Sequence, residues 1–366
     1  MFDRRLIQNF DWVLVLLLLL IAAVSLTNLY SATYPIWDAG GRNIFLKQIY
    51  WFLIGFAFFF MMIPFDYHYI ERMAYPIYIL SLGLLVVVLL IGRVFSGSQS
   101  WISMGGITFQ PSEFSKVALV IILSKFFAGQ EYTEYRLRDL WRPFLLVAMP
   151  FILIIKQPDL GTALMLFIIS SSIILFMKVN WRSLLILIFM TAPVIPFIWF
   201  TLKDYQQKRI LTFINPENDP LGSGYNIIQS MIAVGSGFLW GKGYLKGTQT
   251  RLHFLPEQHS DFAFSVLAEE WGFAGSLILI LLYLILILWG LSIAKNSKDM
   301  FGSVLSVGII SIVFWQLVIN IGMTIGLLPV VGIPLVFFSS GGSSIISTMI
   351  GMGLLMSISM RRFMFQ

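Results

Sequence analysis

Acidic side chains gather in one short stretch of this chain, FLPEQHSDFAFSVLAEEWGFAG, which spans residues 254–275. Asp261 lies where the polar half of the stretch gives way to a long apolar run. Partial loss of water there would disfavour the charged carboxylate and make it a better proton acceptor. Asp261 is therefore the candidate general base. Glu269 and Glu270 are expected to cap a helix or to form hydrogen bonds between helices.

Metal binding is a second chemistry that this stretch could support. Two of the three histidines of the chain lie beside or in it, namely His253 and His259, but the HExxH spacing is absent and Pro256 interrupts a single helix. A histidine-ligated metal is therefore not expected. Carboxylates can still hold a hard divalent cation such as Mg²⁺ or Mn²⁺. Two roles stay open for Asp261, base or metal ligand, and the sequence requires no cofactor.

Two further polar segments lie at the ends of apolar runs. In QPSEFSK, Glu113 and Lys116 are three residues apart, so they share a helix face and can pair, either as a structural ion pair or within a site. In KQPDLGTAL, Lys156 and Asp159 flank a proline, and Asp159 starts the next helix, where the helix dipole stabilises an anion. The dipole does not explain Lys156, which is kept as a candidate for substrate support.

A long loop, residues 202–260, combines cations with glycine-rich turns. Its segment 225–239 is half apolar and too short to cross a bilayer, which predicts a re-entrant or interfacial helix. Gly241-Lys242 is followed by glycine rather than Ser or Thr, which excludes a nucleotide-binding P-loop. Cations beside a membrane suit an anionic lipid headgroup, by specific binding or by general attraction. Those of the loop are Lys203, Lys208, Arg209, Lys242, Lys246 and Arg251.

The uncharged segment NIGMTIGLLPVVGIPLVFFSSGGSS, residues 320–344, ends in a group of serines. A hydroxyl such as that of Ser343 can hydrogen-bond a sugar or a phosphate. The alternative is that these small residues only let helices pack closely.

The elements that must position these residues are membrane helices. Of 366 residues, 58% are hydrophobic and 11% charged, and the mean hydropathy is +0.85. A soluble domain is about 45–50% apolar and about 25% charged. The net charge of +6 does not indicate a nucleic-acid partner, because the cations lie in short loops between apolar runs. The absence of cysteine excludes disulfides, thiolate zinc sites and cysteine nucleophiles.

About 20 apolar residues are needed to cross a bilayer. The predicted fold is an all-α polytopic membrane protein, one domain over residues 1–366, whose first span is an uncleaved anchor. Its ten predicted spans are 12–30, 47–64, 74–92, 112–128, 143–156, 161–177, 183–201, 270–292, 303–326 and 338–359.

The positions of Lys and Arg predict the orientation. With both termini inside, the inner segments hold 13 of the 24 cations, and the short outer segments with the outer span ends hold 5. The other six lie in the loop 202–260, which is discounted because loops near about 60 residues translocate largely regardless of charge. The long loop, and Asp261 with it, is therefore expected outside.

Several motifs together resemble the SEDS family (shape, elongation, division and sporulation), over nearly the whole chain. They are QPSEFSK, KQPDLGTAL, NPENDPLGSGYNIIQS, GSGFLWGKGYLKGTQT, LPEQHSDFAFSVLAEEWG and the serine-rich segment quoted above. The amino-acid sequence of the long loop is more similar to the elongation branch of the family than to the division branch. The resemblance implies a multi-pass protein of the bacterial plasma membrane that polymerises lipid II at the outer face and releases undecaprenyl diphosphate. It also implies a class B penicillin-binding protein as partner.

The resemblance also implies roles for individual residues. Asp261 matches the catalytic aspartate of the family, Glu113 and Lys116 its functionally important Glu and Lys, and Asp159 the aspartate of its QPDLGTA motif. Lys156, Lys242 and Ser343 are added as residues that bind or support the substrate. The chain departs from the family at Ser100, where many relatives carry Arg, and at Val336, where Pro is usual.

Two other functions remain alternatives. A lipid II flippase would need polar residues along the whole crossing, whereas the polar residues here gather on one side. A non-catalytic scaffold that recruits the penicillin-binding protein is the third reading.

Overall fold

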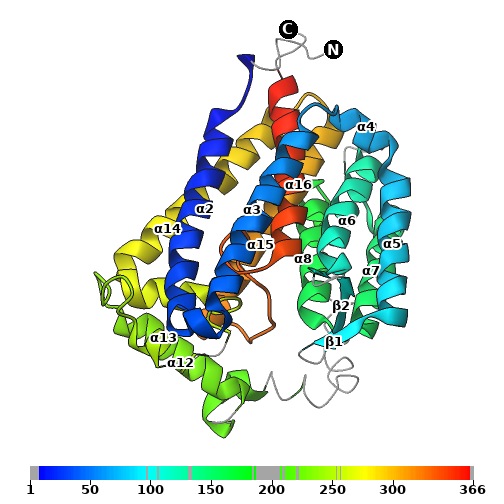
Figure 1. Ribbon diagram of the computed structural model, residues 1–366. Coiled ribbons are helices and arrows are strands. Elements are labelled where there is room, and N and C mark those ends of the chain that lie inside the picture. Colours follow the sequence, from blue (N-terminus) through cyan, green and yellow to red (C-terminus); the bar gives the residue numbers. More distant parts are fainter. Residues whose placement is uncertain are drawn as a thin grey trace.

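The computed structural model describes residues 8–95, 98–104, 107–130, 134–183, 185–186, 207, 211–219, 222–252, 254–255 and 257–362. α-Helices make up most of the described chain (Figure 1). They are α2 (Trp12–Thr33), α3 (Arg42–Met62), α4 (Tyr67–Arg72), α5 (Ala74–Ile91), α6 (Pro111–Ala128), α7 (Trp141–Lys156), α8 (Leu160–Phe176), α12 (Ser223–Ser236), α13 (Thr248–Arg251), α14 (Ala263–Lys295), α15 (Met300–Thr324) and α16 (Gly342–Arg361).

Nine of the ten predicted spans coincide with helices, and the remaining one, 183–201, lies almost wholly outside the described residues. By length and composition, five helical stretches of the described chain can cross a membrane. They are Trp12–Met62, which joins α2 and α3, then Ala74–Ile91, Ala263–Lys295, Met300–Thr324 and Gly342–Arg361. The chain is a helical, multi-pass membrane protein, and the count of ten spans stays a prediction.

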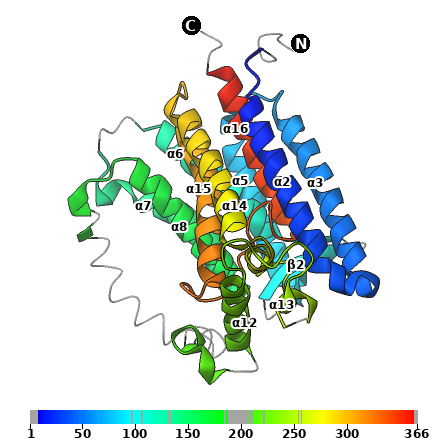
Figure 2. The same cartoon turned by 90° about the vertical axis from the view of Figure 1, so that its left-hand side faces the viewer.

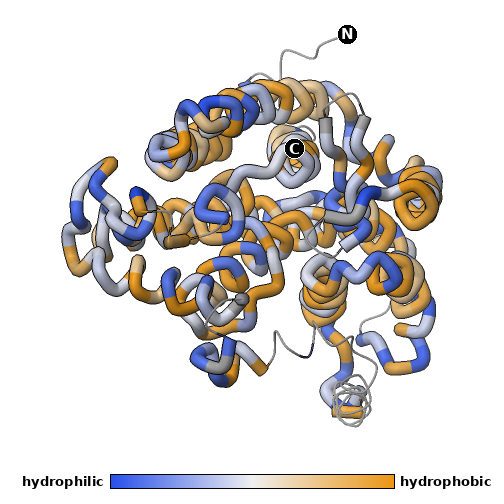
Figure 3. Tube along the Cα trace, turned by 60° about the horizontal axis from the view of Figure 1, so that its bottom comes forward, coloured by the Kyte–Doolittle hydropathy of each residue, from blue (hydrophilic) through white to orange (hydrophobic). Residues whose placement is uncertain are grey.

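The central helices are buried and the peripheral ones face outward. α15 and α16 are buried over most of their length, and α16 packs on α3, α6 and α15 (Figure 2). α5 instead exposes large apolar side chains such as Leu80 and Leu90. Figure 3 shows hydrophobic stretches along helices at the outside of the molecule as well as inside it. An apolar exterior is what a bilayer requires of a spanning helix.

A small antiparallel sheet, order β1-β2-β3, interrupts the all-α pattern between α5 and α6. Its strands are β1 (Arg93–Phe95), β2 (Ser98–Met104) and β3 (Ile107–Phe109). The sheet, α12 and α13 lie at one end of the molecule, whereas α2 begins and α16 ends at the opposite end (Figure 1). The predicted helix at 225–239 is present as α12, which packs against α14 and α15.

A break in α14 fixes the segment that follows Asp261. Gly272 has φ 64° and ψ −160°, and a Cβ there would come 2.3 Å from the amide nitrogen of Gly241. The loop takes up the backbone groups that the break frees, because Phe273 N donates to Phe238 O at 2.8 Å and Lys242 N donates to Glu269 O at 3.0 Å. The first part of α14, residues 263–271, is therefore held by the long loop as well as by its own helix.

Candidate active site

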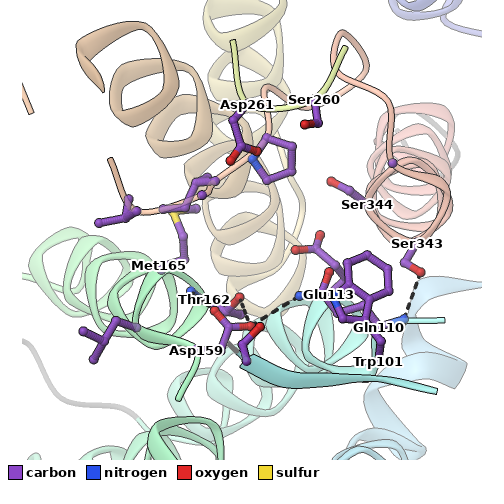
Figure 4. A pocket seen from close by; sticks show the side chains of 18 of the residues that line it. Trp101, Gln110, Glu113, Asp159, Thr162, Met165, Ser260, Asp261, Ser343 and Ser344 are labelled. Carbon is purple, nitrogen blue, oxygen red and sulfur yellow. Dashed lines mark hydrogen bonds between the residues drawn. The ribbon is translucent and has the colours of Figure 1, made fainter. Parts of the chain in front are cut away.

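A polar cavity of about 420 Å³ lies at the end of the molecule that carries the sheet. Its wall combines side chains from β2, the first turns of α6 and α8, the turn before α14, and the segment 331–344 (Figure 4). Five sequence-predicted residues from four separate parts of the chain meet there, namely Glu113, Lys116, Asp159, Asp261 and Ser343.

Glu113 and Lys116 form a buried ion pair on the first turns of α6. Lys116 Nζ donates to Glu113 Oε1 at 2.7 Å, and the two side chains are only 3% and 5% exposed. The other oxygen of Glu113, Oε2, is buried and accepts no hydrogen bond from the described residues. The pair holds one lysine charge inside the wall and leaves one carboxylate oxygen able to accept a bond.

Asp159 is the N-cap of α8. Its carboxylate accepts from Thr162 N at 3.1 Å and from Thr162 Oγ1 at 2.9 Å, which satisfies the helix start. Ser100 Oγ and Gln110 Nε2 also donate to Asp159, at 3.1 and 3.3 Å. Asp159 therefore ties β2 and the start of α6 to α8, and Ser100 belongs to this network rather than being a neutral substitution.

Asp261 ends the turn that leads into α14 and points into the cavity from the side opposite Asp159 (Figure 4). Its carbonyl accepts from Asn320 Nδ2 at 3.0 Å, and the same amide group donates to Ile333 O at 2.9 Å. A Cβ on Gly332 would come 3.6 Å from Asp261 Oδ2. Asn320 thus fixes the backbone of Asp261 against the segment that closes the cavity.

Two neighbours of Asp261 also line the cavity. Burial lowers the pKa of His259 below its usual value of 6.5, against the smaller opposing effect of the Glu257 carboxylate 3.9 Å away. His259 is therefore a neutral imidazole at pH 7. Ser340 N donates to His259 O at 2.9 Å, which joins this turn to the serine-rich segment.

The serines of the segment 339–344 divide into two kinds. Ser343 Oγ accepts from Gln110 N at 3.0 Å and so links α16 to the start of α6. Ser344 Oγ is buried, lines the cavity and makes no hydrogen bond with the described residues. Ser344 is consequently better placed than Ser343 to offer its hydroxyl to a ligand.

The structure does not bring Lys156 or Lys242 to the cavity. Lys156 is exposed at the end of α7. Lys242 Nζ pairs at 2.7 Å with Glu269 Oε1, which is fully buried and also accepts from the amides of Thr248 and Gln249. Glu269 thus has the hydrogen-bonding role expected from the sequence, and Glu270 likewise accepts from Ser31 Oγ at 2.5 Å.

Sequence reasoning missed several residues of the wall, including Trp101, Gln110 and Met165, and also Asn320 behind it, which bonds the backbone of Asp261. Asn320 had a signal, since an amide in an otherwise apolar span is costly unless it has a function. Trp101 and Met165 had none, because apolar side chains are ordinary in a membrane protein.

The cavity carries an excess of negative charge. Its lining residues include four carboxylates, those of Glu113, Asp159, Glu257 and Asp261, and one lysine, Lys116. Among the described residues, no three His, Cys, Asp or Glu side chains gather closely enough to hold a metal ion by themselves. A cation here would have to take some of its ligands from a bound anion, as Mg²⁺ does with substrate phosphates.

The chain is similar to known proteins over nearly its whole length. A profile of the FtsW/RodA/SpoVE family, described as cell cycle protein, matches residues 9–363. Peptidoglycan glycosyltransferase MrdB of Escherichia coli is 40% identical over 352 residues, which are 95% of this chain and 94% of that protein. A chain of a solved peptidoglycan synthase complex, studied for its coordination of polymerization and crosslinking, is 33% identical with a TM-score of 0.83, covering 97% of this chain and 98% of that one. The crystal structure of rod shape determining protein RodA of Thermus thermophilus is 29% identical with a TM-score of 0.72 and the same coverage.

Proposed function

The chain belongs to the FtsW/RodA/SpoVE family of cell cycle proteins and is a peptidoglycan glycosyltransferase, and we propose that it joins sugars in the polar cavity around Asp261. The observation that carries this proposal is the convergence of four separated polar segments on one cavity at one end of the helices. The proposed substrate is lipid II, in line with the resemblance, and the proposed role is glycan-strand synthesis during cell elongation.

Asp261 is the proposed base. It removes the proton of the 4-hydroxyl of the acceptor N-acetylglucosamine, and that oxygen attacks the anomeric carbon of the donor N-acetylmuramic acid. The bond from this carbon to the diphosphate breaks, undecaprenyl diphosphate leaves, and the inverted product is a β-1,4 link. The diphosphate ester carries the driving energy, so no nucleotide takes part. A positioned base of this kind contributes about 10²- to 10⁴-fold to the rate.

The other lining residues have supporting roles. Asp159 holds β2, the start of α6 and α8 together, and the pair of Glu113 with Lys116 fixes both side chains on the first turns of α6, so their main effect is on the shape of the cavity. Ser344 Oγ and Glu113 Oε2 are buried polar atoms in this wall without partners among the described residues, and they are the proposed acceptors or donors for sugar hydroxyls.

A divalent cation is proposed to enter with the diphosphate. The carboxylates of the cavity would otherwise repel that anion, and the charge of Lys116 is already compensated by Glu113. Phosphate oxygens would supply most ligands of the cation, and Asp261 is the lining residue that could join them as a ligand, in place of its role as base. When bound, the cation would neutralise charge on the leaving diphosphate.

The proposed setting is the outer face of the bacterial plasma membrane, with a class B penicillin-binding protein as the partner that cross-links the strands. Polymerisation is favoured over flipping because the middle of α6, from Val117 to Leu123, is apolar and buried. A path for a charged headgroup across the membrane would need polar side chains there.

The decisive experiment compares purified Asp261→Asn, Asp261→Ala and Glu257→Gln proteins in polymerisation of lipid II, with unfolding midpoints measured in parallel. Glu257→Gln is the matched control on the same turn for loss of a charge. We expect both Asp261 variants to fold and to lose at least about 100-fold in rate. Strand synthesis at the unaltered rate by folded Asp261→Ala would refute the base assignment. A raised requirement for the divalent cation in Asp261→Asn would instead identify Asp261 as a ligand, and vesicle flipping by inactive variants would favour the transporter.

A further inference from the structure

A second cavity, of about 470 Å³, lies at the opposite end of α6 from the active-site cavity. It is formed where α5 begins, α6 ends and α7 begins. Nine residues separate Lys116 from Lys125 on α6, which is about 13.5 Å along the helix axis. The two cavities therefore lie toward opposite ends of α6, which is one of the predicted spans.

Two cations meet at this second cavity without a carboxylate. Lys125 Nζ lies 5.1 Å from the ring centre of Tyr75, and Arg142 lies 5.3 Å from that of Trp141. Among the described residues no acidic side chain lines this cavity, and neither cation forms an ion pair with a carboxylate there. Cation–π contacts hold a charge without cancelling it, so the cavity stays positive.

The position of Arg142 is unfavourable without a ligand. It lies in the first turn of α7, where the helix dipole disfavours a cation, and no acidic side chain occupies that turn. An anion in the cavity would offset the dipole and both side-chain charges together. Apart from Gly129 and Gln130 the remaining lining is apolar or aromatic, with Trp141 and Leu145 exposed and Phe126 half-buried.

We propose that this cavity binds an anionic phospholipid of the leaflet opposite the active site, with its phosphate between Lys125 and Arg142 and its acyl chain along Phe126 and Leu145. Basic hollows between spanning helices suit such headgroups, each cation contributing about fivefold to binding. An apolar groove beside the charges distinguishes a lipid from a soluble anion. The proposal is independent of the chemistry at Asp261.

The test places the full-length protein in nanodiscs of phosphatidylcholine with a small fraction of photoactivatable phosphatidylglycerol. After irradiation, the labelled peptides from residues 123–146 are quantified by mass spectrometry. We expect Lys125→Gln/Arg142→Gln to lose about thirtyfold of this labelling, and Arg142→Gln alone about fivefold. The charge-conserving Lys125→Arg/Arg142→Lys protein should keep most of it, which separates loss of binding from loss of fold.

The matched control removes the same charge elsewhere on the same side. Lys178→Gln/Arg182→Gln is suitable, because Arg182 also stacks on an exposed tryptophan, at 5.8 Å, but neither residue lines the cavity. Its labelling should change less than about twofold. Any of four results would overturn the assignment to an anionic lipid. They are equal labelling by photoactivatable phosphatidylcholine, unchanged labelling of the double variant, an equal loss of labelling in the control variant, and displacement of the lipid by inorganic phosphate.

Discussion

Removal of Lys116 alone should destabilise the protein at pH 7 and should do so much less at pH 5.5. In the Lys116→Met variant, the buried carboxylate of Glu113 loses its only hydrogen-bonded cation, and its second oxygen has no partner among the described residues. Breaking such a buried pair typically costs about 3–5 kcal/mol.

Proton uptake sets a ceiling on this loss. An ordinary glutamic acid titrates near pH 4.3, so protonating one costs about 3.7 kcal/mol at pH 7 and about 1.6 kcal/mol at pH 5.5. The Glu113 side chain of the variant can always take up a proton instead of remaining a buried ion. We therefore expect Lys116→Met to lose about 3–4 kcal/mol at pH 7 and roughly 2 kcal/mol less than that at pH 5.5.

The double variant Glu113→Gln/Lys116→Met separates stability from function. Replacing both partners of a buried pair is often close to neutral for stability. The double variant should thus recover most of the folding energy but not the activity, because both side chains line the cavity. Free energies would come from reversible unfolding in mixed micelles at the two pH values, and activity from lipid II polymerisation. A loss below about 1 kcal/mol in Lys116→Met, or an equal loss at both pH values, would refute the reasoning.

Three further outcomes are expected. Asp159→Ala should lower the free energy of unfolding by about 1–2 kcal/mol because α8 loses its N-cap, and Asp159→Asn should keep much of that stability, as measured by unfolding. Burial lowers the pKa of His259, so the unfolded chain binds a proton at this residue before the folded chain does as the pH falls below about 6.5. The wild type should therefore lose stability between pH 7.5 and 5.5, and His259→Gln should lose less, as measured by unfolding at the two pH values. Glu269→Gln should lower the local stability of the loop by about 1–3 kcal/mol, because Lys242 loses its ion-pair partner but stays partly hydrated. Hydrogen exchange at the amides of Thr248 and Gln249 should then speed up by at least about fivefold.

Hydrophobicity predicts the helices well, because a spanning helix must be apolar over its length. The predicted spans 74–92 and 161–177 differ by at most one residue at either end from Ala74–Ile91 and Leu160–Phe176. The span predicted to begin at 270 starts two residues before the break at Gly272. The helical segment from Ala263 to the break lies outside that predicted span, because Glu269 and Glu270 interrupt the apolar run; tertiary partners, Lys242 and Ser31, hold them.

The sequence also did not predict contacts between residues that are far apart in the chain. Lys242 was grouped with loop cations that could meet a lipid headgroup, and nothing in its neighbourhood identified Glu269, 27 residues later, as its partner. The sheet between α5 and α6 was also missed, because a segment rich in Gly and Ser indicates a turn before it indicates strands. Convergence of Glu113, Asp159 and Asp261 on one cavity depends on how α6, α8 and α14 pack, which local pattern does not give.

The acidic residues divide according to what compensates their charge. Asp159 is compensated by a helix start, Glu113 by Lys116 on the same helix, and Glu269 by Lys242 together with two amides. Asp159 and Glu269 thereby join segments that would otherwise separate. Asp261 differs in its setting, since Asn320 fixes its backbone while its carboxylate lies at the cavity opposite Asp159. A base needs this combination of a fixed backbone and a side chain that reaches the substrate. Asp159 and Glu113 line the cavity, so substitutions there should change stability and activity together, whereas substitution of Asp261 should change activity alone.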